Sequence, residues 1–203
     1  MEYKASVVIP NLNGAGWLRD SIESVWAQTY IGWANWINPA GHAADIDGLE
    51  DNYARLFHML TDNHIDFDYG EEQMMEKHAF VTRDENGCAR LRVGNMSYRV
   101  VVISGMETIR PTTMKLLSDF AAIGGKIIFA GDAPVCVNAR RNDAPAAFAR
   151  EYGICVPFDG NALADAVRAV SDAPISVTLE DGTAANDVFV QMRNFGDSIG
   201  FVL

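Results

Sequence analysis

The sequence of 203 residues has few cysteines, no clustered basic residues and no long apolar run. Its three cysteines, Cys88, Cys136 and Cys155, are odd in number and lack CxxC spacing, so they predict neither a disulfide framework nor a zinc site. Sixteen Lys and Arg against 27 Asp and Glu give a net charge of −11, which disfavours a nucleic-acid partner. No apolar stretch is long enough to cross a bilayer. We therefore expect a cytoplasmic protein with no membrane partner and no cofactor.

The composition is otherwise that of an ordinary globular protein, with 49% apolar and 21% charged residues. Short β-branched runs alternate with stretches whose apolar residues have helical spacing, which predicts a mostly parallel sheet with crossover helices. We expect helices over residues 14–30, 49–63, 71–79, 144–152 and 161–170, and one more that begins at Pro111 and ends at Gly124 and Gly125. We expect strands over residues 5–10, 64–70 and 126–131. We also expect a hairpin that turns at Gly94 and Asn95 and whose second arm, residues 99–104, is a central strand.

The pattern changes near residue 175, after which only strand-like runs follow, over 175–180, 187–194 and 198–203. We therefore divide the chain into an α/β domain, residues 1–174, and a β segment, residues 175–203. The predicted fold class is a three-layer α/β/α, flavodoxin-like domain with a C-terminal β hairpin.

The stretch SVVIPNLNGAGWLRDSIESVWAQTY, residues 6–30, resembles the start of inverting glycosyltransferases of the GT-A fold. That resemblance implies a nucleotide sugar and a divalent metal held by a D-x-D motif. Two candidates exist, Asp45 with Asp47 and Asp66 with Asp68, but D-x-D occurs often by chance in acidic proteins. We interpret the first pair as loop capping and the second as solvation of a strand end, and keep a transferase fragment as the alternative function.

A second resemblance covers most of the chain. Two stretches carry it: YARLFHMLTDNHIDFDYGEEQMM and LRVGNMSYRVVVISGMETIRPTTMKLLSDFAAIGGKIIFAGDAP. They resemble the glutamine-amidotransferase-like domain of large bacterial glycoside hydrolases, which is similar to the trimerisation domain of some β-galactosidases. DVFVQMRNFGDSIGFVL is similar to the opening hairpin of the β-sandwich that follows this domain. The resemblance implies a class I amidotransferase-like fold in an accessory or oligomerisation domain, whose partners are its own subunits or neighbouring domains.

Catalytic amidotransferases of this fold need a cysteine on a sharp strand-to-helix turn, activated by a histidine. Here the strand that should carry it ends in Gly131 and Asp132, and Cys136 lies four residues beyond. All four histidines precede this point. We therefore predict that the catalytic triad is absent and that this chain is not catalytic by itself.

The remaining candidates are polar residues at strand ends and two tryptophans. Glu107 and Asp132 each follow an expected parallel strand, where open α/β sheets hold ligands, so a small-ligand sensor is a further alternative. Trp33 and Trp36 lie in a long Gly-, Asn- and Pro-containing stretch and predict an inter-subunit or inter-domain contact.

Overall fold

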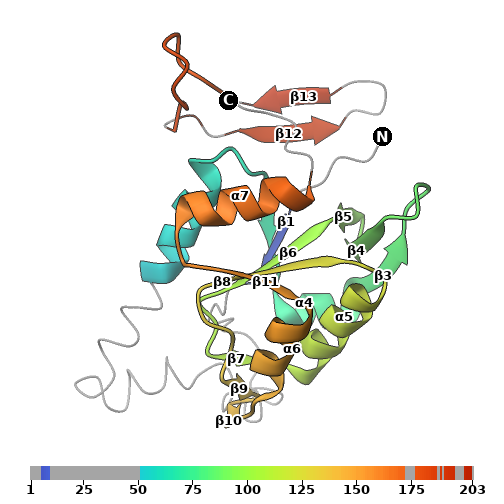
Figure 1. Ribbon diagram of the computed structural model, residues 1–203. Coiled ribbons are helices and arrows are strands. Elements are labelled where there is room, and N and C mark those ends of the chain that lie inside the picture. Colours follow the sequence, from blue (N-terminus) through green and yellow to red (C-terminus); the bar gives the residue numbers. More distant parts are fainter. Residues whose placement is uncertain are drawn as a thin grey trace.

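The computed structural model describes residues 6–9, 51–171, 177–186, 188, 190–194 and 199–202. Within this part the protein is a mixed α/β fold (Figure 1). None of the described helices is both long and apolar enough to pass through a membrane.

A five-stranded sheet forms the centre of the fold, in the order β2, β1, β6, β8, β11. Every neighbouring pair in it is parallel, as the alternation of strand and helix patterns predicts. Strand β6 is buried along its whole length, which explains its uninterrupted apolar sequence. The five strands are β1 (Ser6–Ile9), β2 (Phe67–Tyr69), β6 (Val100–Ser104), β8 (Lys126–Ala130) and β11 (Gly153–Val156).

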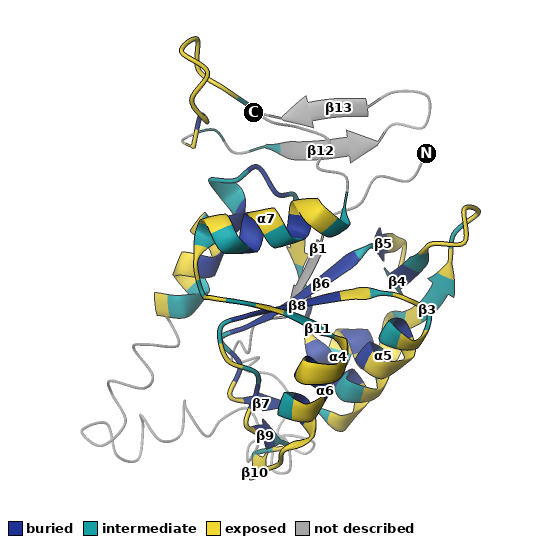
Figure 2. Cartoon of the chain, in the orientation of Figure 1, coloured by how far each residue is buried: buried dark blue, intermediate teal, exposed yellow. Residues whose placement is uncertain are grey.

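Helices cover both faces of this sheet. Val101 and Ile103 belong to the hydrophobic cluster beneath α4, α5 and α6, whereas Val100 and Val102 belong to the cluster beneath α7 and the helical residues 51–61. Figure 2 shows the buried residues on the sheet and on the inner sides of these helices. Side chains of one strand alternate between faces, so each face has its own apolar core. The labelled helices are α4 (Glu72–His78), α5 (Pro111–Ala122), α6 (Ala144–Tyr152) and α7 (Gly160–Val170).

An antiparallel sheet of three strands precedes β6, formed by β3 (Ala79–Arg83), β4 (Ala89–Val93) and β5 (Met96–Tyr98). The predicted turn at Gly94 and Asn95 is confirmed, because β4 and β5 flank it and pair with each other. The predicted second arm is corrected: β5 pairs with β4, whereas β6 leaves the hairpin and joins the parallel sheet. Strand β3 was not predicted, although its partner β4 follows after only residues 84–88 and the two strands form a local hairpin.

A second small sheet lies beyond the ends of β6 and β8, formed by β7 (Thr108–Ile109), β9 (Cys136–Val137) and β10 (Arg140–Arg141). Its hairpin turns at Asn138 and Ala139, which have φ of 48° and 57°. Two successive left-handed residues match the right-handed twist of the strands that they join.

At the C-terminal end, β12 (Gln191–Asn194) and β13 (Ile199–Val202) pair antiparallel. In the described part of the predicted strand 175–180, the β pairing consists of one bridge, between Thr178 and Ala184. The neighbouring Ala185 is buried, and its carbonyl oxygen lies 3.0 Å from Nε2 of His64. The C-terminal segment therefore contacts the α/β part of the chain through a buried polar pair.

Candidate functional site

Two regions hold those of the sequence-predicted site residues that the structure describes: the carboxyl edge of the parallel sheet and a cavity beside β2. At the carboxyl edge, the paired strands β6 and β8 are each followed by a glycine of positive φ, Gly105 at 62° and Gly131 at 86°. Such backbone favours glycine and turns the chain sharply away from the strand. Glu107 and Asp132 follow these turns, and both are exposed.

The main chain ties this edge together. The carbonyl oxygen of Glu107 accepts hydrogen bonds from the backbone N–H groups of Val135 and Cys136, both at 3.0 Å. The Thr108 hydroxyl accepts the N–H of Ala139 at 2.8 Å. These hydrogen bonds join the segment after β6 to the segment after β8, and the side chains of Glu107 and Asp132 are exposed on these segments.

Cys136 is buried on β9, beyond the turn that follows β8. Burial, and then the negative charge of Glu107, raise the pKa of its thiol. The thiolate is the nucleophilic form, so both influences work against nucleophilic chemistry at Cys136. The described histidines lie elsewhere: His58 in the helical residues 51–61, His64 just beyond them, and His78 at the end of α4.

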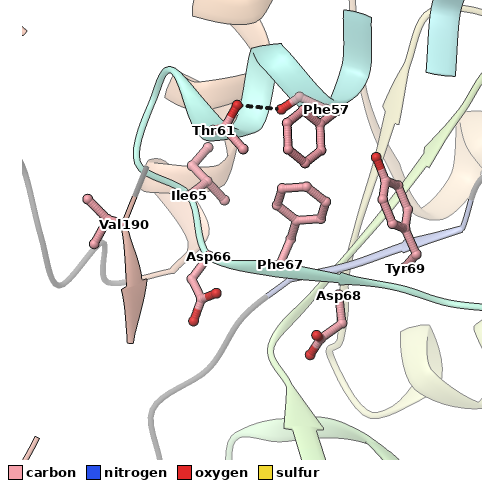
Figure 3. Close-up of a pocket in the computed structure, with 8 residues that line it drawn as sticks. All are labelled: Phe57, Thr61, Ile65, Asp66, Phe67, Asp68, Tyr69 and Val190. Carbon is pink, nitrogen blue, oxygen red and sulfur yellow. Dashed lines mark hydrogen bonds between the residues drawn. The ribbon is translucent and has the colours of Figure 1, made fainter. Parts of the chain in front are cut away.

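The second region is a cavity of about 280 Å³ beside β2 (Figure 3). Helical residues form one side, the strand itself another, and Val190 of the C-terminal segment a third. Its lining residues are Phe57, Thr61, Ile65, Asp66, Phe67, Asp68, Tyr69 and Val190.

Aromatic rings occupy the side of β2 that faces the helical residues 51–61. Phe67 packs edge-on against Phe57, with ring centroids 6.0 Å apart, and against Tyr69, at 5.2 Å. Tyr69 in turn stacks on Tyr53 at 4.8 Å. Burial, and then the Tyr53 hydroxyl, raise the pKa of Tyr69, so it stays a neutral phenol.

The carboxylates of Asp66 and Asp68 point away from these rings (Figure 3). The Tyr98 hydroxyl donates a 2.8 Å hydrogen bond to Oδ2 of Asp68. Burial, then this hydrogen bond to Asp68, and then the charges of Asp68 and Asp66 raise the pKa of Tyr98. The two carboxylates lie on the same side of the segment 66–69 (Figure 3), and the charges of both act on the Tyr98 phenol.

The sequence found Asp66 and Asp68 but missed the rings beside them. The helical spacing of Tyr53, Leu56, Phe57 and Leu60 predicts one buried stripe; Leu56 and Leu60 are indeed buried, but Phe57 stays 37% exposed. The alternation of Asp66, Phe67, Asp68 and Tyr69 was the available signal, because residues i and i+2 of a strand share a face.

In the alternative interpretation, Asp66 and Asp68 hold a divalent metal ion, and such a site needs further ligands from the part of the chain that the structure describes. No group of three or more His, Cys, Asp or Glu side chains is arranged there to hold a metal ion. The pair Asp45 and Asp47 lies outside the described residues, as do the interface candidates Trp33 and Trp36.

Comparison of the chain with protein-family models, with curated proteins and with solved structures gives no match.

Proposed function

We propose that this chain is a non-catalytic, glutamine-amidotransferase-like domain that serves as an accessory or oligomerisation module of a carbohydrate-active enzyme. In this proposal hydrolysis of the sugar is carried out elsewhere in the parent protein. The proposal combines the resemblance of residues 53–75 and 91–134 to such domains with the geometry at the carboxyl edge of the sheet.

The strand order supports the flavodoxin-like part of the proposal. Numbered along the chain, the five parallel strands follow the order 2-1-3-4-5, which is the order of flavodoxin-like doubly wound sheets. The antiparallel pair β12 and β13 fits the start of a following β-sandwich.

The single observation that carries the non-catalytic reading is the turn after β8. An amidotransferase needs its cysteine on this turn, exposed and activated. Gly131 and Asp132 occupy it instead, and Cys136 is buried with a raised pKa. The fold therefore keeps the sharp backbone turn without a nucleophile on it.

An antibody against this chain tests the accessory role in its cell of origin. We expect it to detect a protein much larger than the chain itself, and the immunoprecipitate to hydrolyse aryl glycosides. We also expect the isolated chain to show no glutamine hydrolysis, before or after Cys136→Ala. A native protein of the chain's own size without glycosidase activity contradicts the accessory role, and glutaminase activity that Cys136→Ala abolishes contradicts the non-catalytic reading.

A transferase fragment remains the second candidate because Asp66 and Asp68 lie on the same side of their segment and line one cavity. The position of these two aspartates in the sheet, however, argues against a nucleotide-binding role. Asp66 precedes β2 and Asp68 is the middle residue of that strand, whereas doubly wound sheets bind nucleotides beyond the carboxyl ends of their strands.

A further inference from the structure

The loop between β3 and β4, residues 84–88, contains an asparagine followed directly by a glycine, Asn86 and Gly87. Figure 1 shows this loop projecting beyond the end of β3. Both residues are exposed, and Gly87 has φ of 77°, as the last residue of a three-residue hairpin loop often does. Glycine has no Cβ, so nothing on its own residue shields the backbone nitrogen of Gly87. The loop therefore presents an asparagine side chain to water beside an accessible main-chain nitrogen.

An asparagine in this setting can react with its own main chain. When the backbone nitrogen of Gly87 loses its proton to a base, it attacks Cγ of Asn86 and closes a succinimide ring. The bond from Cγ to Nδ2 breaks, and the nitrogen leaves as ammonia after taking a proton from water. A second water molecule opens the ring at either carbonyl, which gives aspartate or isoaspartate. The reaction consumes only water, and it makes asparagine one of the thermolabile residues.

Hydrogen bonds within the loop oppose this reaction. The backbone N–H of Gly87 donates to the carbonyl oxygen of Asp84 at 2.9 Å, which withholds its proton from a base. The Asp84 carboxylate accepts the backbone N–H of Asn86 at 3.0 Å and that of Cys88 at 2.9 Å. Its other oxygen accepts Nη2 of Arg90, which is 3% exposed and so gives the carboxylate a buried anchor. Asp84 therefore holds the loop closed from both its main chain and its side chain.

We propose that Asn86 is a site of deamidation in the folded protein, and that the Asp84 carboxylate sets the rate by holding the loop closed. The reaction proceeds from the small population in which the loop is open and the Gly87 N–H is free. Isoaspartate adds one main-chain atom to the loop, so the hydrogen bonds of Asp84 cannot all form again. In the described structure, Nε and Nη1 of Arg90 have no hydrogen-bond partner, so loss of Asp84 leaves a buried charge unpaired. Deamidation thus destabilises the β3–β4 hairpin.

Peptide mapping tests the site. The full chain and a blocked peptide of residues 81–91 are incubated together at pH 8. Trypsin releases residues 84–90 as one fragment, so mass spectrometry distinguishes Asn86 from Asn13, which also precedes a glycine but lies outside the described residues. We expect conversion of Asn86 in the full chain at a rate about tenfold to a hundredfold below that of the peptide, because opening the loop breaks hydrogen bonds to a charged group. Asn86→Gln should abolish the change in this fragment, since glutamine must close a larger ring.

Hydrogen exchange tests the role of loop opening without any substitution. Exchange of the Gly87 amide and deamidation of Asn86 both need the Gly87 N–H free of Asp84. Relative to the peptide, the two rates should therefore be slowed by the same factor, to within about threefold, when exchange is followed by NMR.

The carboxylate itself is tested with Asp84→Ser. A serine hydroxyl can accept the N–H two residues on, though more weakly than aspartate, so the turn keeps its form, which circular dichroism checks. We expect deamidation about threefold to tenfold faster than in the unmodified chain. The matched control is Glu85→Ser, which removes the same charge from an exposed residue of the same loop and should change the rate by less than about twofold.

Calorimetry tests the consequence: the unmodified chain should melt lower after incubation, whereas Asn86→Gln should not. Four results would overturn the proposal. A rate below about a hundredth of the peptide's excludes Asn86 as a site, and a rate equal to the peptide's excludes protection by the loop. Unequal slowing of exchange and deamidation shows that the Gly87 hydrogen bond does not control the reaction. Equal rates in Asp84→Ser and Glu85→Ser show that the Asp84 carboxylate does not hold the loop.

Discussion

At the scale of single residues, Glu72 has the most unusual environment among the described acidic side chains. It is 6% exposed, and its carboxylate accepts the backbone N–H of Arg110 at 2.9 Å. Arg110 is the N-cap of α5 and forms no cap with its own side chain. Glu72 therefore caps α5 from a different helix, and the positive end of the helix dipole partly compensates its charge.

Burial nevertheless dominates and raises the pKa of Glu72, against the smaller lowering effects of Thr113 and Arg110. The folded protein thus holds the Glu72 proton more tightly than the unfolded chain does. Folding stability that depends on Glu72 is complete below the unfolded pKa of 4.5, falls as pH rises through the folded pKa, and is constant above it.

We predict that Glu72→Gln raises stability near neutral pH, because the amide oxygen still accepts the Arg110 N–H without a buried charge. Denaturant unfolding between pH 4 and pH 8 should show the gain growing from near zero as pH rises. Glu76→Gln is the control, since Glu76 contacts Arg110 at 3.1 Å but has an exposed side chain. A gain that is independent of pH, or equal in both variants, contradicts a buried charged cap.

At the scale of elements, the end of α5 shows why two adjacent glycines are not equivalent. Gly124 donates to the carbonyl of Ala121 at 2.8 Å and Gly125 to that of Phe120 at 2.9 Å, which is the hydrogen-bond pattern of a Schellman motif. Gly124 has φ of 89° and open space around it, whereas a Cβ on Gly125 would overlap the buried ring of Phe120. Backbone conformation requires the first glycine, and packing requires the second.

We predict that Gly125→Ala costs about 1–3 kcal/mol through overpacking. Gly124→Ala should cost roughly 1 kcal/mol through left-handed strain alone. A double-mutant cycle checks the cause, because Phe120→Leu should reduce the cost of Gly125→Ala but not that of Gly124→Ala. Equal coupling of both glycines to Phe120 would show that ring overlap is not the reason.

The same helix shows how far sequence alone could predict the fold. Pro111 at its start and the two glycines at its end are local signals that the structure confirms. The apolar spacing predicts a buried stripe of Met114, Leu117, Phe120 and Ala121, of which Leu117 and Phe120 are buried and the other two partly buried. Strands β3, β7, β9, β10 and β11 were missed, because a short strand is stabilised by partners that its own sequence does not reveal. The cavity beside β2 was missed for a related reason: Phe57, Phe67 and Val190 meet only after folding.

At the scale of the whole molecule, the question is how the C-terminal segment depends on the α/β domain. In the part of the chain that the structure describes, the residues of the two buried clusters lie between positions 56 and 167. His64 nevertheless has φ of 56°, a conformation that favours glycine or asparagine, and is 7% exposed against Ala185. A histidine in this conformation, with its ring beside the Ala185 carbonyl, fits a role in holding the C-terminal segment.

We predict that a chain ending at residue 174 still folds but melts a few degrees lower, since losing one buried hydrogen bond costs about 1 kcal/mol and a chain of this size loses about 2–4 °C per kcal/mol. In the full chain, His64→Asn should lower the melting temperature by a similar amount. In the shortened chain it should be neutral or stabilising, because asparagine suits the left-handed backbone and the contact with Ala185 is already absent. Calorimetry of the four proteins measures this coupling. Equal effects of His64→Asn in both chains would show that His64 does not act through its contact with the C-terminal segment. An unfolded shortened chain would place the domain boundary beyond residue 174.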